Sequence, residues 1–215
     1  MVDPSLTPTR FIDSDHPDIV AFAREHAGAG DIRARAVALA RAVRDAVPYN
    51  LWAFRIEPEY FVASQVLRQA SAFCVPKAVL LAAVARAAGV PSRIGFADVR
   101  NHLTSPRFSA IMDSPDFHWH AYTALLIEGR WLKATPAFDI ALCERSGVAP
   151  LEFDGTQDSI FQPFDTQGRR SMEYIGFHGE FDDLPYERFS AEMQRIYPRL
   201  LAGVAAERAR RAAAG

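Results

Sequence analysis

The fold of this chain is decided by the stretch CVPKAVLLAAVARAAGVP, residues 74–91. Pro76 suits the first turn of a helix, because the N–H that proline lacks would have no partner there. Gly89, with a proline two residues later, is a strong signal for the helix end. Between these ends only one lysine and one arginine are charged, and a helix that is apolar nearly all round belongs inside a domain. The sequence therefore predicts a buried helix that begins at Cys74.

The segments around this helix predict the rest of the core. Residues 31–47 repeat apolar side chains at three- and four-residue steps and stop before a proline, which predicts a helix. Residues 93–99 and 118–127 have the composition of strands, and Glu128-Gly129 predicts a tight turn into a partner strand at 130–134. Helices followed by antiparallel strands indicate an α+β domain in which the buried helix packs on one sheet face.

The remaining segments divide the chain into three parts. We expect a lead-in at residues 1–30 with a short helix at 18–27, a domain at 31–186, and a C-terminal helical extension at 187–215. Within the domain we expect a helical stretch at 59–69, a loop at 101–116 and an irregular covering segment at 150–186. The extension is predicted to be one long helix, over residues 187–214.

Composition excludes several classes of protein. The 215 residues carry 24 Lys and Arg against 26 Asp and Glu, a net charge of −2, which gives no basic footprint for nucleic acid. Two cysteines cannot form a disulfide framework or a CxxC metal pair. The longest apolar stretches are too short to span a membrane, and residues 1–10 lack the pattern of a signal peptide. We therefore expect a soluble, cytoplasmic protein; its oligomeric state cannot be read from the sequence.

Cys74 has a chemical consequence at its predicted position. Free N–H groups and the helix dipole stabilise negative charge at a helix N-terminus, which favours the nucleophilic thiolate and can also hold an oxyanion. His120 lies on a strand expected beside this helix, where it could act as the base, with a third polar group orienting its ring. The alternative is that Cys74 is a small buried hydrophobic residue without chemistry.

Several short blocks occur in an order that resembles a known family. They are FCVPKA at 73–78, ARAAGVPSR at 85–93, HAY at 120–122, GRW at 129–131 and TPA at 135–137. Together they resemble the transglutaminase-like core, over roughly residues 30–140. The resemblance implies a papain-like fold with Cys74 as nucleophile and His120 as base. It implies a cysteine hydrolase or acyltransferase that acts on a peptide, amide or ester through a thioester and needs no cofactor.

The chain departs from the family pattern at the third catalytic position. The family places an aspartate there, and this chain has Thr135. Three interpretations follow: Asp139 reaches His120 after a bend, the Thr135 hydroxyl holds the imidazole, or the protein is a degenerate binding domain that performs no chemistry. We favour Asp139, because its charge would stabilise an imidazolium. Asp139 also suits a helix N-cap for residues 140–145.

Other candidates are weaker. His118 and His120 would share one face of a regular strand, so a third ligand from the loop before them would make a transition-metal site, but we expect no metal. Gln65 could add an oxyanion donor, although an exposed helix glutamine is the simpler interpretation. Cys143 is predicted to be structural. Trp131 is predicted to be a core residue of the hairpin.

Overall fold

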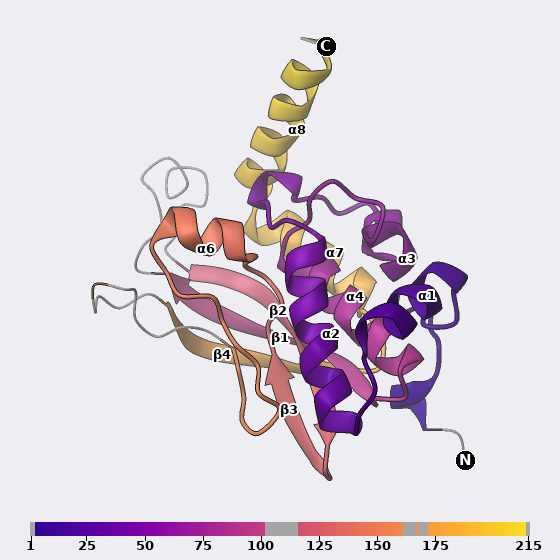
Figure 1. The fold of residues 1–215 in the computed structure, drawn as a ribbon. Helices are drawn as coiled ribbons and strands as arrows, with labels where there is room; N and C mark the ends of the chain where they lie inside the picture. The colour runs from indigo at the N-terminus through magenta and orange to yellow at the C-terminus, as the bar shows by residue number, and fades with distance from the viewer. Residues whose placement is uncertain (1–2, 102–115, 161–166, 168–171, 214–215) are drawn as a thin grey trace.

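The predicted buried helix is α4, Cys74–Ala87, and it packs against β1 and β2 on one side and against α1, α2 and α3 on the others (Figure 1). The computed structural model describes residues 3–101, 116–160, 167 and 172–213. The helical elements are η1 Pro4–Leu6, α1 Pro17–His26, α2 Ile32–Ala46, η2 Leu51–Ala53, η3 Pro58–Phe61, α3 Ala63–Val66, α4, α6 Ile140–Ser146, α7 Tyr186–Ile196 and α8 Pro198–Ala213. The strands are β1 Ser92–Asn101, β2 Asp116–Ile127, β3 Arg130–Ala134 and β4 Met172–Phe181.

Every residue of α4 except Ala87 is buried, including both of its charged residues. The Lys77 ammonium donates to the main-chain carbonyl oxygens of Arg44, at 2.7 Å, and Val47, at the end of α2. The Arg86 guanidinium donates to the carbonyl oxygens of Ser92 and Asp182, at 2.9 and 2.6 Å. Buried charges are tolerated when they are hydrogen-bonded in this way. These two side chains therefore fix the central helix to its neighbours.

The strands form one antiparallel sheet in the order β3-β2-β1-β4. Glu128 and Gly129 both have positive φ, as the predicted tight turn between β2 and β3 requires. The sheet is curled, because its two edge strands approach each other: Lys133 Nζ of β3 lies 4.0 Å from a carboxylate oxygen of Glu180 on β4. The architecture is α+β, with the Cys74 helix on a curled four-stranded sheet, as the sequence predicts.

Three predicted segments differ from the structure. The irregular segment 150–186 contains β4, an edge strand whose two glycines, Gly176 and Gly179, weaken the strand pattern. The single helix at 187–214 is two helices, because Pro198 cannot donate an N–H to continue α7. The helical stretch at 59–69 is reduced to the short η3 and α3. The predicted loop at 101–116 lies mostly outside the described residues.

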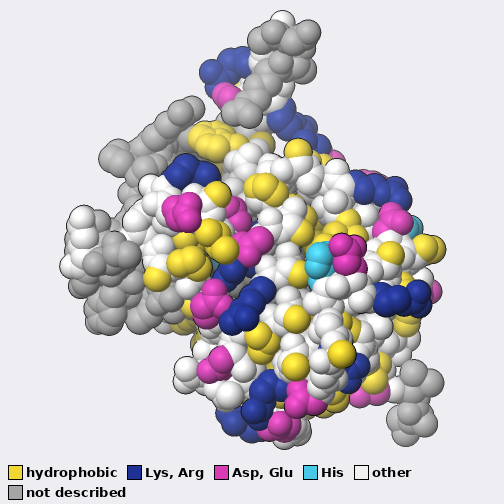
Figure 2. All heavy atoms as spheres, viewed as in Figure 1, with side chains coloured by type: hydrophobic (Ala, Val, Ile, Leu, Met, Phe, Trp, Pro, Cys, Tyr) yellow, Lys and Arg dark blue, Asp and Glu magenta, His cyan; other side chains and the backbone are white. Residues whose placement is uncertain are grey.

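The C-terminal helices belong to the main core. Phe189 and Met193 of α7, and Leu200 and Val204 of α8, are buried in the same hydrophobic cluster as α4. Beyond this contact α8 extends away from the body of the molecule (Figure 1). Within the described ranges, no helix is both long and apolar enough to cross a membrane. Positive and negative side chains are interspersed over the face in Figure 2.

Candidate active site

Cys74 is the first residue of α4, and β2 crosses directly in front of its thiol. The main-chain N–H groups of Ala121, on β2, and of Val75 donate to the sulfur. Cys74 and His120 line the same small pocket, of about 40 Å³. They are 9% and 7% exposed. The structure thus brings the predicted nucleophile and base to one small pocket at the helix N-terminus.

Burial controls the protonation of both residues. It raises the pKa of the Cys74 thiol to about 11, although the N–H donors of Ala121 and Val75 oppose that shift. Burial also lowers the pKa of His120 to about 3. The expectation that the helix N-terminus yields a resting thiolate is therefore wrong, because removing the sulfur from water outweighs the helix dipole. Burial therefore shifts each group toward its neutral form, the thiol of Cys74 and the imidazole of His120.

Asp139 is the N-cap of α6. Its Oδ1 accepts from the Leu142 N–H at 2.9 Å, and its Oδ2 accepts from the Tyr49 N–H at 2.7 Å. These N–H donors and the Lys77 ammonium hold the pKa of Asp139 below its usual range, although burial acts to raise it. The hydrogen bonds described for Asp139 are therefore those of a helix N-cap, the other role that the sequence indicates for this residue. A role for Asp139 in orienting His120 stays a prediction.

Thr135 follows β3 on the sheet face that carries His120. The register pairs Ala134 of β3 with Thr123, so the next residue, Thr135, faces the same way as Tyr122 and His120. Its main-chain N–H continues the extended pairing by donating to Ser159 at 3.0 Å. The Thr135 side chain is buried, and its hydroxyl interacts with that of Tyr174 on β4. The family's aspartate position is therefore occupied by a buried hydroxyl on the His120 side of the sheet.

A second histidine cluster was not predicted. The Asp98 carboxylate lies 2.6 Å from His178 Nε2 and 3.0 Å from His118 Nδ1, and it also accepts from the Trp119 N–H. These bonds hold the pKa of Asp98 below its usual value against the opposing effect of burial. The pairing depends on β4 lying beside β1, which local sequence patterns do not reveal.

A bulge at Trp119 corrects the prediction that His118 and His120 share one face. Trp119 has φ of 58°, and the register runs from Ala97 opposite His120 to Val99 opposite Phe117. The extra residue turns His118 toward Asp98. Among the described residues no group of three or more His, Cys, Asp or Glu side chains is placed to hold a metal ion. Residues 102–115, most of the loop expected to supply a third ligand, lie outside that description.

The other candidates occupy structural positions. Gln65 is an exposed residue of α3. Cys143 is buried in α6, with its sulfur 3.9 Å from the Phe138 carbonyl oxygen. Trp131 is half-buried against the smaller core cluster beneath the Arg93 guanidinium, which lies 4.5 Å from the ring centroid. Trp131 therefore covers the edge of the hairpin and is less buried than predicted.

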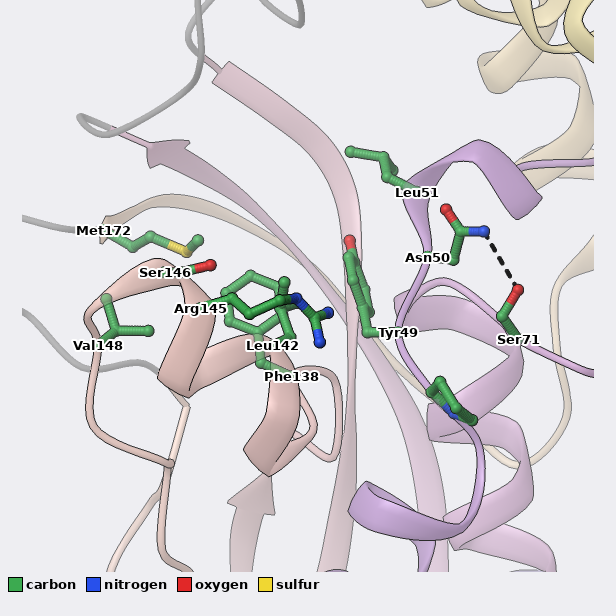
Figure 3. Close-up of a pocket in the computed structure, with 11 residues that line it drawn as sticks. Tyr49, Asn50, Leu51, Ser71, Phe138, Leu142, Arg145, Ser146, Val148 and Met172 are labelled. Carbon is green, nitrogen blue, oxygen red and sulfur yellow. Dashed lines mark hydrogen bonds between the residues drawn. The ribbon is translucent and has the colours of Figure 1, made fainter.

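A larger cavity, of about 590 Å³, lies next to the Cys74 pocket (Figure 3). Tyr49 and Leu51 line both spaces. The cavity separates the segment that follows α2 from α6 and the residues flanking that helix. A substrate reaching Cys74 from this side would pass Tyr49.

Comparison with known proteins identifies the family. Residues 20–136 match the transglutaminase-like superfamily, and the chain belongs to that superfamily. A search of curated proteins found no match. Among solved structures the chain is similar to one from Cytophaga hutchinsonii described as a "putative cysteine protease", at 22% identity and a TM-score of 0.47. That similarity covers 62% of this chain and 40% of the other protein's length.

Proposed function

We propose that this protein is a cysteine-dependent acyl-transfer enzyme, a hydrolase or a transferase, that acts on a peptide, amide or ester carbonyl. The observation that carries the proposal is the position of the Cys74 thiol, at the N-terminus of a buried helix and in one pocket with His120. Membership of the transglutaminase-like superfamily supports the same chemistry. We also propose that the protein is cytoplasmic.

The chemistry begins from the neutral pair. As the Cys74 sulfur attacks the carbonyl carbon, His120 accepts the thiol proton, so that the thiolate forms only during attack. The carbonyl oxygen becomes an oxyanion, for which the N–H groups at the start of α4 are the available donors. When the tetrahedral intermediate collapses, the bond to the leaving group breaks and His120 returns the proton to that group.

The thioester is resolved by a second attack. Water or an amine adds to the thioester carbonyl, His120 takes a proton from it, and the Cys74 sulfur leaves as the thiol. Water gives hydrolysis, and an amine gives transfer. Both outcomes use the same residues.

The group that orients His120 has two candidates in this proposal. Asp139 offers a charge, which would stabilise an imidazolium. Thr135 offers a hydroxyl from the strand next to His120, on the same sheet face. The Tyr174 hydroxyl, which interacts with Thr135, would fix the direction of that group.

The test is hydrolysis of p-nitrophenyl acetate by the wild-type chain and by single variants. Cys74→Ala and His120→Ala should each remove the protein-dependent rate, and Cys143→Ala should keep it. Each variant is compared by thermal melting, so that a loss of rate is read only from folded protein. An equal rate in wild type and Cys74→Ala would favour the alternative, a binding domain that keeps the fold without the chemistry.

A further inference from the structure

We propose that the large cavity beside Cys74 binds an apolar group that carries a carboxylate, and that Arg145 determines this specificity. The inference rests on the proposed function, since it describes the part of the substrate beyond the reacting carbonyl. It extends that function to a substrate class: anionic, with an apolar or aromatic body.

The cavity has an apolar wall. Phe138 and Leu142, before and within α6, and Val148, after it, form one side, and Leu51 lies on the other (Figure 3). The volume of about 590 Å³ falls in the range of small-molecule sites. Such sites gain affinity from apolar surface and orient the ligand with a few polar groups.

Arg145 is the one charged residue among the described residues that line the cavity, and it is exposed to solvent. Its guanidinium points from α6 toward Tyr49 (Figure 3). The other polar side chains in the described lining carry hydroxyl and amide groups, and two of these, Asn50 and Ser71, already bond to each other at 3.2 Å. In the described part of the chain no carboxylate forms an ion pair with Arg145. An exposed guanidinium that lines a cavity with an apolar wall, and that has no ion pair among the described residues, is complementary to an anionic ligand.

Tyr49 connects this cavity to the reactive thiol. Its ring packs edge-on against Phe138, with centroids 4.9 Å apart, and it also lines the Cys74 pocket. Burial, and to a lesser degree the nearby Cys74, raises the pKa of the Tyr49 hydroxyl. Asp139 fixes the main chain of Tyr49. A ligand can therefore place its carboxylate at Arg145 and its reacting carbonyl on the Cys74 side of Tyr49.

The binding test does not require catalysis. Titration calorimetry compares 3-phenylpropionate with uncharged 3-phenylpropan-1-ol, in wild type, Arg145→Gln and Arg145→Lys. Arg130→Gln is the matched control, because Arg130 is an exposed arginine at the start of β3, outside the cavity. We expect the carboxylate to bind about tenfold more tightly than the alcohol to wild type, as one charge-assisted contact allows. Arg145→Gln should remove this preference, Arg145→Lys should keep part of it, and Arg130→Gln should leave it unchanged.

Equal affinity for the two probes in wild type, a preference that survives Arg145→Gln, or no binding of either probe would overturn the inference. A second measurement separates it from the proposed function: acylation by p-nitrophenyl hydrogen glutarate against p-nitrophenyl butyrate. Acylation that needs Cys74 but ignores Arg145 would refute the specificity alone. Binding that depends on Arg145 without any Cys74 acylation would refute the enzymatic proposal alone.

Discussion

At the scale of single residues, Cys74 and His120 illustrate how burial competes with a helix terminus. The helix dipole contributes about 1 kcal/mol or less at most sites, whereas full desolvation can move a pKa by several units. Burial therefore raises the pKa of the thiol to about 11 despite the helix terminus, and it lowers the pKa of the imidazole, on β2, to about 3. Catalysis at neutral pH would therefore proceed from a neutral pair, with proton transfer coupled to attack.

This neutral pair predicts the pH dependence of alkylation. Because only the thiolate reacts and the pKa of Cys74 is about 11, iodoacetamide labelling of Cys74 should be slow at pH 7 and rise about tenfold per pH unit up to pH 10. Mass spectrometry of the two cysteine peptides measures both rates at once, and Cys74, which is 9% exposed, should label before Cys143, which is 1% exposed. A rate that is already constant between pH 6 and 8 would show a resting ion pair instead.

His120 also predicts a loss of stability in acid. Its folded pKa of about 3 lies below the unfolded value of about 6.5, so the unfolded chain takes up the proton first as the pH falls. The contribution of neutral His120 to the free energy of unfolding is complete above pH 6.5. It is lost as the pH falls toward 3, at up to about 1.4 kcal/mol per pH unit. Urea unfolding of wild type and His120→Asn should show a shallower decline in the variant. Parallel declines would mean that His120 is not buried as described.

Two substitutions separate the candidates that orient His120. Thr135→Val should slow acylation of Cys74 about three- to tenfold, the equivalent of one hydrogen bond, with little change in melting temperature. Asp139→Asn should mainly lower stability, by about 1–2 kcal/mol, because it weakens the cap of α6 and the bond to Tyr49. An Asp139→Asn variant that melts like wild type but loses acylation would assign the orienting role to Asp139.

At the scale of elements, the parts predicted from the sequence are those defined by local signals. The helix from Cys74 has a proline in its first turn and a glycine after its last, and the β2–β3 hairpin has its Glu128-Gly129 turn. The elements missed depend on distant contacts. β4 gains its place only by pairing with β1, and the bulge at Trp119 is fixed by the bond from its N–H to Asp98. The Asp98 histidine cluster could not be predicted for the same reason.

Lys77 gives a prediction for the central helix. Lys77→Met removes the donor to two carbonyl oxygens near the end of α2, which should cost about 1–3 kcal/mol at pH 7. Burial lowers the pKa of Lys77 to about 8, below the unfolded value, so the stability contributed at this site should rise between pH 8 and 10.5. Urea unfolding of wild type and variant at pH 7 and 9.5 measures both effects. If the free energies of unfolding of wild type and Lys77→Met differ less at pH 9.5 than at pH 7, this account is contradicted.

At the scale of the whole molecule, the C-terminal helices complete both the core and the site. Phe189, Met193 and Leu200 line the Cys74 pocket as well as the core, which explains why that pocket is small. A chain ending at residue 186 would expose the surface that these side chains cover, so we expect it to lose its cooperative thermal transition. A chain ending at residue 206 keeps the buried Val204 and should melt close to the full chain. A cooperative melt of the shorter chain would support the division at 187 predicted from the sequence.

The most direct test of the central claim is the mass of the protein during reaction with p-nitrophenyl acetate. The account predicts one added acetyl group, located on Cys74 by peptide mapping and released by hydroxylamine, as a thioester requires. The adduct should be absent from Cys74→Ala, should form much more slowly in His120→Ala, and should be unchanged in Cys143→Ala. An acetyl group on another residue, or equal acetylation of wild type and His120→Ala, would contradict the assignment of Cys74 and His120 as a catalytic pair.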